Sequence, residues 1–194
     1  MNTFFKLLGC TVISSALILM SGCVEDDEDN NSQKFSSAVA STSQKQFKTI
    51  GKFPNFTTTD LNGKQVTNDI FAQKKLTVIN IWGTFCGPCI AEMPELGEWA
   101  SEMSNNVQLI GLVCDIEGAD DHSTINDAKA ILNDANANFL NIIPNGGGLS
   151  QYLNNVEAVP TTIFVDSEGN ILDKTITGAD VDSYKEVVAE YLNE

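Results

Sequence analysis

Two cysteines separated by a glycine and a proline are the residues of this sequence best suited to chemistry. Cys86 and Cys89 follow a β-branched apolar run at 76–82 and open a segment whose apolar spacing predicts a helix over 86–103. A cysteine at a helix N-terminus has a lowered thiol pKa, because free backbone amides and the helix dipole favour the thiolate. We expect Cys89, one turn further along, to be less accessible than Cys86. The spacing is that of a thiol pair that closes a small disulfide ring.

The two residues between the cysteines are compatible with this geometry. Gly87 lets the chain turn, and the fixed φ of Pro88 suits an early helical position. A closed zinc site needs four ligands, and beyond the pair the sequence offers only His122 and Cys114. We therefore predict neither a metal ion nor another cofactor.

Other cysteine chemistries fit less well. A peroxidatic cysteine at position 86 would require a proline where the sequence has Ile79 and a threonine where it has Gly83. Cys114 ends a predicted buried strand, where a free cysteine is expected to behave as an inert small apolar residue rather than a third redox thiol. His122 lies in an acidic loop and is expected to be exposed to solvent.

The elements that must position the cysteine pair alternate along the chain. Strands are predicted over 53–59, 65–68, 76–82, 107–114, 139–143, 161–165 and 171–177. Helices are predicted over 86–103, 125–135, 149–154 and 181–192. Strand–helix–strand succession implies right-handed crossovers and parallel pairing, whereas the Asn62-Gly63 turn predicts an N-terminal hairpin. The last two strands are joined by a short turn and should be antiparallel, so we expect an α/β fold with a mixed sheet between helices.

The N-terminal segment is predicted to direct export and lipidation. Residues 1–22 have the short apolar core of an export signal, and Met20-Ser21-Gly22-Cys23 resembles the lipobox of bacterial lipoproteins, which implies lipidation of Cys23. Segment 23–46 is acidic and polar and is predicted to be a flexible tether to a domain at 47–194. The formal net charge of −15 and the absence of arginine argue against a nucleic-acid partner.

Two separated motifs point to a family. The sequence W-x-x-F-C-G-P-C at 82–89 resembles the active site of the thioredoxin superfamily, and 158–166 (AVPTTIFVD) resembles its cis-proline loop and following strand. The likeness covers about residues 52–194. The lipid-anchor signal, the hairpin and the extra helix and strand around 123–143 resemble the TlpA/ResA branch of extracytoplasmic thioredoxins. This resemblance implies a thioredoxin fold with a four-stranded core sheet, an N-terminal hairpin and an inserted helix–strand.

The resemblance also assigns roles to residues. Cys86 would attack a substrate disulfide and Cys89 would resolve the mixed disulfide. Pro160 would be cis and shape the substrate groove, and the backbone of Val159 could pair with an extended substrate segment. The residues implied to form the substrate surface are Trp82, Phe85, Gly87, Pro88, Val159 and Pro160, although a core role is the default for Trp82.

A third catalytic residue is suggested by a departure from the family pattern. Many cytoplasmic thioredoxins carry a buried aspartate six residues before the first cysteine, but this position is Asn80, which cannot take a proton. Glu92 follows Cys89 by three residues on the same side of the predicted helix. In ResA-like members a glutamate at this spacing lies near the active site. Our hypothesis is that Glu92 is partly buried, has a raised pKa and accepts the proton of Cys89; the alternative is a solvated surface glutamate.

These patterns predict a lipid-anchored thiol–disulfide oxidoreductase outside the bacterial cytoplasm. The Gly-Pro dipeptide favours the reducing end of the scale, where thioredoxin lies near roughly −270 mV. Protein disulfides would be its substrates, with apocytochrome c among them by family likeness, and a membrane thiol donor of the DsbD/CcdA type would reduce it again. A disulfide-forming oxidase and a non-catalytic thioredoxin-fold binding lipoprotein remain the alternatives.

Overall fold

The structure, a computed structural model, describes residues 47–144 and 146–193. The predicted signal peptide, the lipidation residue Cys23 and the tether at 23–46 lie outside the described residues. No helix within the described ranges combines the length and the apolar character needed to cross a bilayer.

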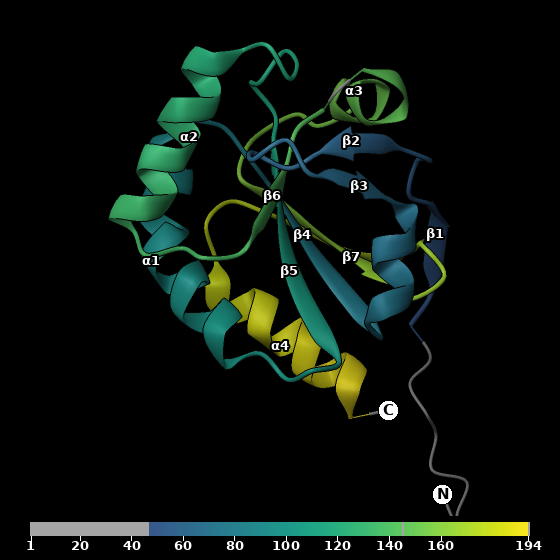
Figure 1. Cartoon of the computed structure of the whole chain (residues 1–194). Coiled ribbons are helices and arrows are strands. Elements are labelled where there is room, and N and C mark those ends of the chain that lie inside the picture. Colours follow the sequence, from purple (N-terminus) through teal and green to yellow (C-terminus); the bar gives the residue numbers. More distant parts are fainter. Residues whose placement is uncertain (1–46, 145, 194) are drawn as a thin grey trace, which may run out of the picture. The chain divides into compact units, whose positions relative to one another are not determined.

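A six-stranded mixed sheet forms the centre of the described fold (Figure 1). Its strand order is β1-β8-β7-β4-β5-β6. The strands are β1 (Thr49–Lys52), β4 (Leu76–Trp82), β5 (Val107–Val113), β6 (Leu140–Ile142), β7 (Thr161–Asp166) and β8 (Asn170–Thr177). Pairing is parallel for β4 with β5 and for β5 with β6, and antiparallel among β4, β7, β8 and β1. The predicted α/β fold with a mixed sheet is therefore confirmed.

The sheet is wider than the four strands that the family resemblance implied. β6 belongs to the predicted insertion, but β1 was not predicted, because all four of its residues are exposed and show no apolar alternation. Main-chain pairing with β8, rather than side-chain burial, holds β1 at the edge of the sheet. A sequence pattern that depends on burial has no signal for such a strand.

The N-terminal hairpin is confirmed as a separate two-stranded sheet of β2 (Thr57–Thr59) and β3 (Gln65–Thr67). Asp60 stabilises its turn by accepting hydrogen bonds from the backbone amides of Asn62 and Lys64, and Gly63 supplies the positive φ of 82° that the turn requires. A 3₁₀ helix, η1 (Asn68–Gln73), follows the hairpin and was not predicted.

Helices cover both faces of the sheet (Figure 1). α1 (Gly87–Glu102), α2 (His122–Asp134) and α4 (Val181–Leu192) pack on one face. α3 (Gly147–Leu153), the hairpin and η1 pack on the other, around a cluster of aromatic rings that includes Phe53, Phe56 and Phe71.

Strand β4, which precedes the helix with the cysteines, runs through the core of the domain. All seven of its residues are buried, since helical layers cover both faces of a central strand. Trp82, its last residue, is completely buried beneath the disulfide, and its indole N–H donates to Asn141 Oδ1 at 2.9 Å. This contact needs a glycine at position 111, because a Cβ there would lie 1.8 Å from Asn141 Oδ1. The core role expected for Trp82 is thus what the structure shows.

Candidate active site

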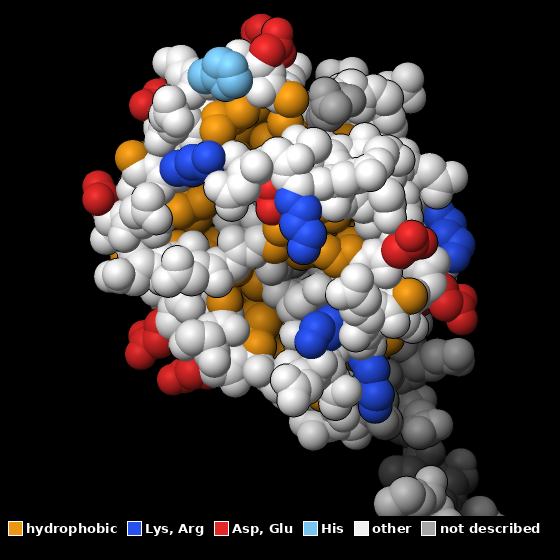
Figure 2. Space-filling view, viewed as in Figure 1, with side chains coloured by type: hydrophobic (Ala, Val, Ile, Leu, Met, Phe, Trp, Pro, Cys, Tyr) orange, Lys and Arg blue, Asp and Glu red, His pale blue; other side chains and the backbone are white. Residues whose placement is uncertain are grey.

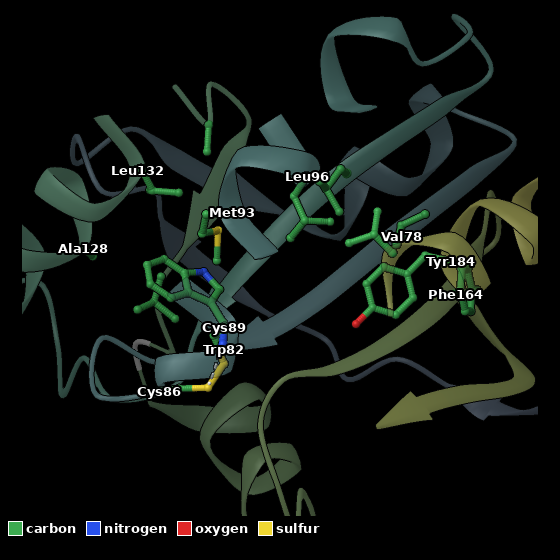
Figure 3. Close-up of a cluster of buried hydrophobic side chains, with 14 of the residues drawn as sticks. Val78, Trp82, Cys86, Cys89, Met93, Leu96, Ala128, Leu132, Phe164 and Tyr184 are labelled. Atoms are coloured by element: carbon green, nitrogen blue, oxygen red, sulfur yellow. Dashed lines mark hydrogen bonds between the residues drawn. A yellow bond between two sulfur atoms is a disulfide. The ribbon is translucent and has the colours of Figure 1, made fainter. Parts of the chain in front are cut away.

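A disulfide between Cys86 and Cys89 lies at the N-terminus of α1 (Figure 3). Cys86 is the N-cap residue, and its Sγ accepts a hydrogen bond of 3.2 Å from the backbone amide of Cys89. Cys86 is 6% exposed and Cys89 is completely buried. Only Cys86 therefore offers its sulfur to a visiting molecule, and a thiolate formed there would receive the helix amide in the same way.

The first turn of α1 contains no acidic residue. Gly87 and Pro88 occupy this turn, are exposed, and place no charge beside the sulfur atoms. Because a carboxylate here would compete with a thiolate for the helix dipole, its absence favours a reactive Cys86. In the disulfide form, neither sulfur is available as the thiolate ligand that a zinc site requires.

The loop between β4 and α1 is fixed by a residue that sequence reasoning missed. Asp115, which follows β5, accepts hydrogen bonds from the backbone amide of Thr84 at 3.1 Å and from its hydroxyl at 2.6 Å. β4 and β5 are parallel neighbours, so their carboxyl ends meet at one edge of the sheet. The sequence showed Asp115 only as one member of an acidic loop.

The two family motifs, more than 70 positions apart, meet at Cys86. The carbonyl oxygen of Val159 lies 3.4 Å from Cys86 Sγ. The Val159–Pro160 peptide bond is cis, and the carbonyl of Pro160 accepts a hydrogen bond of 2.8 Å from the amide of Gly178. The loop that carries Pro160 is thus attached to the segment that leads into α4.

An open groove of about 590 Å³ runs beside the disulfide. Its lining residues come from the loop before α1, the position after β5, the end of α3 and the segment before β7: Phe85, Cys114, Leu153, Asn154, Val156, Glu157, Ala158 and Val159. Phe85, directly before Cys86, is 70% exposed. An apolar ring of this size beside a reactive sulfur is suited to contact with a partner protein.

Glu92 lies inside the protein, on the side of α1 that faces the sheet. It is 5% exposed; its Oε1 accepts a hydrogen bond of 2.9 Å from Asn80 Nδ2, and its Oε2 lies 3.2 Å from the hydroxyl of Tyr184. Burial raises the pKa of Glu92 to about 7, although the bonds from Asn80 and Tyr184 act in the opposite direction. The alternative of a solvated surface glutamate is therefore wrong.

The remaining sequence candidates are less favourably placed for chemistry. Cys114 is half-buried beside the groove, and burial, followed by the charge of Asp115, raises the pKa of its thiol to about 11. It is protonated at neutral pH and so a poor nucleophile, as expected of an inert cysteine. His122 begins α2 and is exposed.

Sequence reasoning also missed Tyr184 and Thr162, which join Asn80 and Glu92 in one buried polar cluster. Asn80 Nδ2 donates to Thr162 Oγ1 at 3.1 Å as well as to Glu92. Tyr184 belongs to the apolar stripe of the last helix and looked like an ordinary core residue. Thr162 follows Pro160 by two positions, and this placement was the only available signal.

Charged side chains are dispersed on one face of the described residues. On the face shown in Figure 2, lysines are scattered among acidic and apolar side chains and form no continuous basic surface. A duplex-binding protein needs such a surface to neutralise phosphates.

Comparisons with known proteins agree with this site. The family model described as Redoxin matches residues 49–190. Thiol-disulfide oxidoreductase ResA of Bacillus thuringiensis subsp. konkukian is 32% identical over 145 residues, which are 74% of this chain and 76% of that protein. A ResA of Bacillus cereus gives the same values.

Solved structures show the same fold. A secreted disulfide oxidoreductase of Mycobacterium tuberculosis, homologous to DsbE of Escherichia coli, has a TM-score of 0.54 at 24% identity, covering 69% of this chain and 94% of its own. The exposed lipoprotein thioredoxin Etrx1 of Streptococcus pneumoniae has a TM-score of 0.56 at 22% identity, covering 71% and 99%. With its thioredoxin fold and its cysteine pair at a helix N-terminus, the chain belongs to the Redoxin family, among the ResA-like thiol–disulfide oxidoreductases.

Proposed function

We propose that this chain reduces protein disulfides outside the cytoplasm, with Cys86 as the nucleophile and Cys89 as the resolving thiol. The observation that carries the proposal is the Cys86–Cys89 disulfide at the N-terminus of α1, with Cys86 partly accessible and Cys89 buried. An attacking sulfur that is more accessible than the second sulfur behind it is the arrangement that two-step exchange requires.

The Cys86 thiolate attacks one sulfur of a substrate disulfide, a Cys86–substrate bond forms, and the other substrate sulfur leaves and takes a proton. Cys89 then loses its proton and attacks Cys86 Sγ, which breaks the mixed disulfide and releases the second substrate sulfur as a thiol. Two electrons and two protons pass to the substrate, and the Cys86–Cys89 disulfide remains.

Glu92 is the proposed acceptor of the Cys89 proton. It lies on the same helix, three residues beyond Cys89, and is buried with a pKa raised to about 7. A carboxyl group with a pKa near the working pH can both accept and return a proton. In Glu92→Gln, which keeps the size of the side chain, we expect the part of the pH dependence near neutrality that belongs to Glu92 to disappear, while ionisation of the Cys86 thiol still contributes; an unchanged profile would remove Glu92 from the mechanism.

The substrate surface is proposed to lie across the groove and the first turn of α1. Phe85 supplies an exposed ring, and the Val159 carbonyl, 3.4 Å from Cys86 Sγ, is placed to accept a backbone hydrogen bond from an extended substrate segment. Gly87 and Pro88 complete this surface, and buried Pro160 shapes it from below. Trp82 supports it from the core.

We assign residues 1–22 to a signal peptide, Cys23 to lipidation, 23–46 to a tether and 47–194 to the redox domain. The lipobox-like sequence supports the anchor, and the similar pneumococcal protein is itself an exposed lipoprotein. Two or three acyl chains on one cysteine would hold the protein at a membrane stably. Apocytochrome c is the proposed substrate among protein disulfides, and a membrane thiol donor of the DsbD/CcdA type would restore the dithiol.

The equilibrium reduction potential of the Cys86–Cys89 pair tests the direction of transfer. We expect a value toward the reducing end, nearer to roughly −270 mV than to −180 mV. A value well above about −180 mV would make the protein a disulfide-forming oxidase. Insulin reduction by the protein and by Cys86→Ala tests catalysis itself, and equal rates would indicate a non-catalytic binding protein.

A further inference from the structure

A chain of polar contacts runs behind the disulfide, from Glu92 to the loop that carries Pro160. Its central member is Tyr184 of α4, which is completely buried (Figure 3). The Tyr184 hydroxyl lies 2.7 Å from the carbonyl oxygen of Gly178, 3.2 Å from Glu92 Oε2 and 3.3 Å from the backbone nitrogen of Asp180. These three groups lie within hydrogen-bond distance of one phenol oxygen, and the Thr162 side chain is a further hydrogen-bond partner of Tyr184.

Counting hydrogens shows that these contacts depend on the proton of Glu92. The phenol has a single hydrogen, the Gly178 carbonyl can only accept, and the Asp180 amide can only donate. The shortest contact, to Gly178, takes the hydrogen when Glu92 is protonated, because the Glu92 O–H then donates to the phenol oxygen. When Glu92 is ionised, two acceptors compete for the one hydrogen, and a carboxylate is the stronger acceptor.

Gly178 connects Tyr184 to the loop that carries Val159 and Pro160. The same residue that accepts from Tyr184 donates its amide to the carbonyl of Pro160 at 2.8 Å. The neighbouring Val159 carbonyl lies 3.4 Å from Cys86 Sγ. The Gly178 amide and the Gly178 carbonyl belong to neighbouring peptide units joined at one Cα, so a movement of the carbonyl when its hydrogen bond changes also turns the amide that attaches this loop.

We propose that Tyr184 is a positioning residue that couples the proton on Glu92 to the substrate loop at Val159 and Pro160. Ionisation of Glu92 draws the Tyr184 hydrogen away from Gly178 and loosens the loop; protonation restores the bond and fixes the loop beside Cys86. The inference rests on the proposed role of Glu92 as acceptor of the Cys89 proton. The loop is then held most firmly at the moment when Cys89 has lost its proton and attacks.

The charged and titratable groups near Glu92 also influence its ionisation. β4 contributes the uncharged amide of Asn80. On α1, Glu95 raises the pKa of Glu92 slightly, and its charge is compensated by Lys185 of α4 at 2.6 Å. Cys89, on the same helix, titrates only when the disulfide is reduced. A titration of the disulfide form therefore isolates the Glu92 proton from that of the thiol.

The test is an NMR titration of the full chain in its disulfide form between about pH 5 and pH 9. The amide of Ala179 belongs to the same peptide unit as the Gly178 carbonyl and reports the hydrogen bond to it. We expect its shift to titrate with the midpoint of the Glu92 carboxyl carbon in the wild type. In Tyr184→Phe this response should vanish, and the ionised fraction of Glu92 at neutral pH should fall about threefold, since the carboxylate loses a donor.

Two further variants complete the design. Tyr152→Phe makes the same chemical change on α3, on the opposite face of the sheet, and should leave the Ala179 titration unchanged. Glu92→Gln removes the titrating proton while keeping Tyr184, so the Ala179 shift should become independent of pH even if Tyr184→Phe does not fold.

The outcomes separate the two proposals. A pH-independent Ala179 shift in the wild type, or a titration in Tyr184→Phe that equals the wild-type curve, overturns the coupling. If Glu92→Gln at the same time changes the pH dependence of thiol exchange, the proposed function stands and only the coupling fails. If thiol exchange is unaffected in Glu92→Gln, the proposed role of Glu92 fails.

Discussion

The helices α1 and α2 both follow parallel strands and begin at the same edge of the sheet, but different chemical groups cap their N-termini. α2 is capped by Asp121, whose carboxylate accepts the amide of Thr124. Hydrogen bonds from the Thr124 side chain, and then from its amide, lower the pKa of Asp121. α1 is capped by a sulfur atom and has no acidic residue in its first turn. Its one buried carboxyl group, that of Glu92, lies in the second turn with a pKa raised to about 7.

This difference in the capping atom shows how a helix N-terminus can either stabilise its helix or support a reaction. A capping carboxylate satisfies the free amides of α2 and stays charged in water, which stabilises the helix and leaves it unreactive. In α1 the sulfur of Cys86 accepts the free amide. The carboxyl group of Glu92 is buried, and it is neutral or charged according to pH. The N-terminus of α2 is structural and that of α1 is suited to a reaction, because an oxygen atom caps the first and a sulfur atom caps the second.

The largest effect is expected from giving α1 the cap of α2. Cys86→Asp should still cap the helix, because aspartate is a preferred N-cap residue. Insulin reduction should nevertheless fall by several orders of magnitude, to the uncatalysed rate, since the attacking sulfur is gone. Cys114→Ser, which alters the remaining described cysteine, should keep wild-type activity; loss of activity there would contradict the assignment of Cys86 and Cys89 as the redox pair among the described residues.

The second effect concerns the buried carboxyl group of α1. The folded pKa of Glu92 is raised from 4.5 to about 7, so the folded state binds more protons than the unfolded state between these values. The free energy of unfolding of the disulfide form should therefore fall as pH rises through this window, by up to about 3 kcal/mol, and level off above it. Denaturant unfolding at several pH values measures this slope.

Glu92→Gln should remove that slope, because an amide does not titrate. Glu98→Gln changes an exposed glutamate of the same helix and should retain the wild-type slope. A wild-type slope in Glu92→Gln would show that another group is responsible.

A smaller effect should follow when an acid is placed in the first turn of α1, as α2 has at its cap. Position 87 is exposed, and a Cβ there meets no other atom within 4 Å, so Gly87→Asp should fold. Its carboxylate should raise the pKa of the Cys86 thiol and slow alkylation of the reduced protein at pH 7 about three- to fivefold. Gly87→Asn is the neutral control, and an equal slowing in both variants would exclude a charge effect.

The smallest effect is expected at the cap of α2. Asp121→Ala should lower thermal stability slightly and leave insulin reduction unchanged, whereas Asp121→Asn should keep most of the cap. Because the folded pKa of Asp121 is lowered, its contribution is present above the unfolded pKa and is lost as pH falls through the folded value. Melting temperatures at neutral and acidic pH should show a wild-type advantage only at the higher pH.

Much of the fold was predictable because burial leaves a periodic trace. The apolar run at 76–82 became the central strand, and the Asn62-Gly63 turn became a hairpin. β1 and η1 were missed, because an exposed edge strand and a short 3₁₀ helix carry no such periodicity. Within the site, the cysteine pair was predictable from its spacing, since both residues belong to one local segment.

The polar cluster around Glu92 was not predictable for the opposite reason. Asn80, Thr162 and Tyr184 come from three elements far apart in the chain, and a hydrogen bond among them leaves no mark on the spacing of any one segment. The same holds for Asp115, whose contact with Thr84 exists only because β4 and β5 are parallel neighbours.

The sequence by itself determined which atoms react: two sulfurs at the start of a helix, because three residues of spacing and a preceding buried strand are local properties of the chain. The tertiary structure alone decided the setting of those atoms. Packing buried Glu92, brought Val159 to Cys86 and aimed the Tyr184 hydroxyl between two acceptors. Desolvation and hydrogen bonding depend on what surrounds a group, and the surroundings exist only once distant segments have packed together.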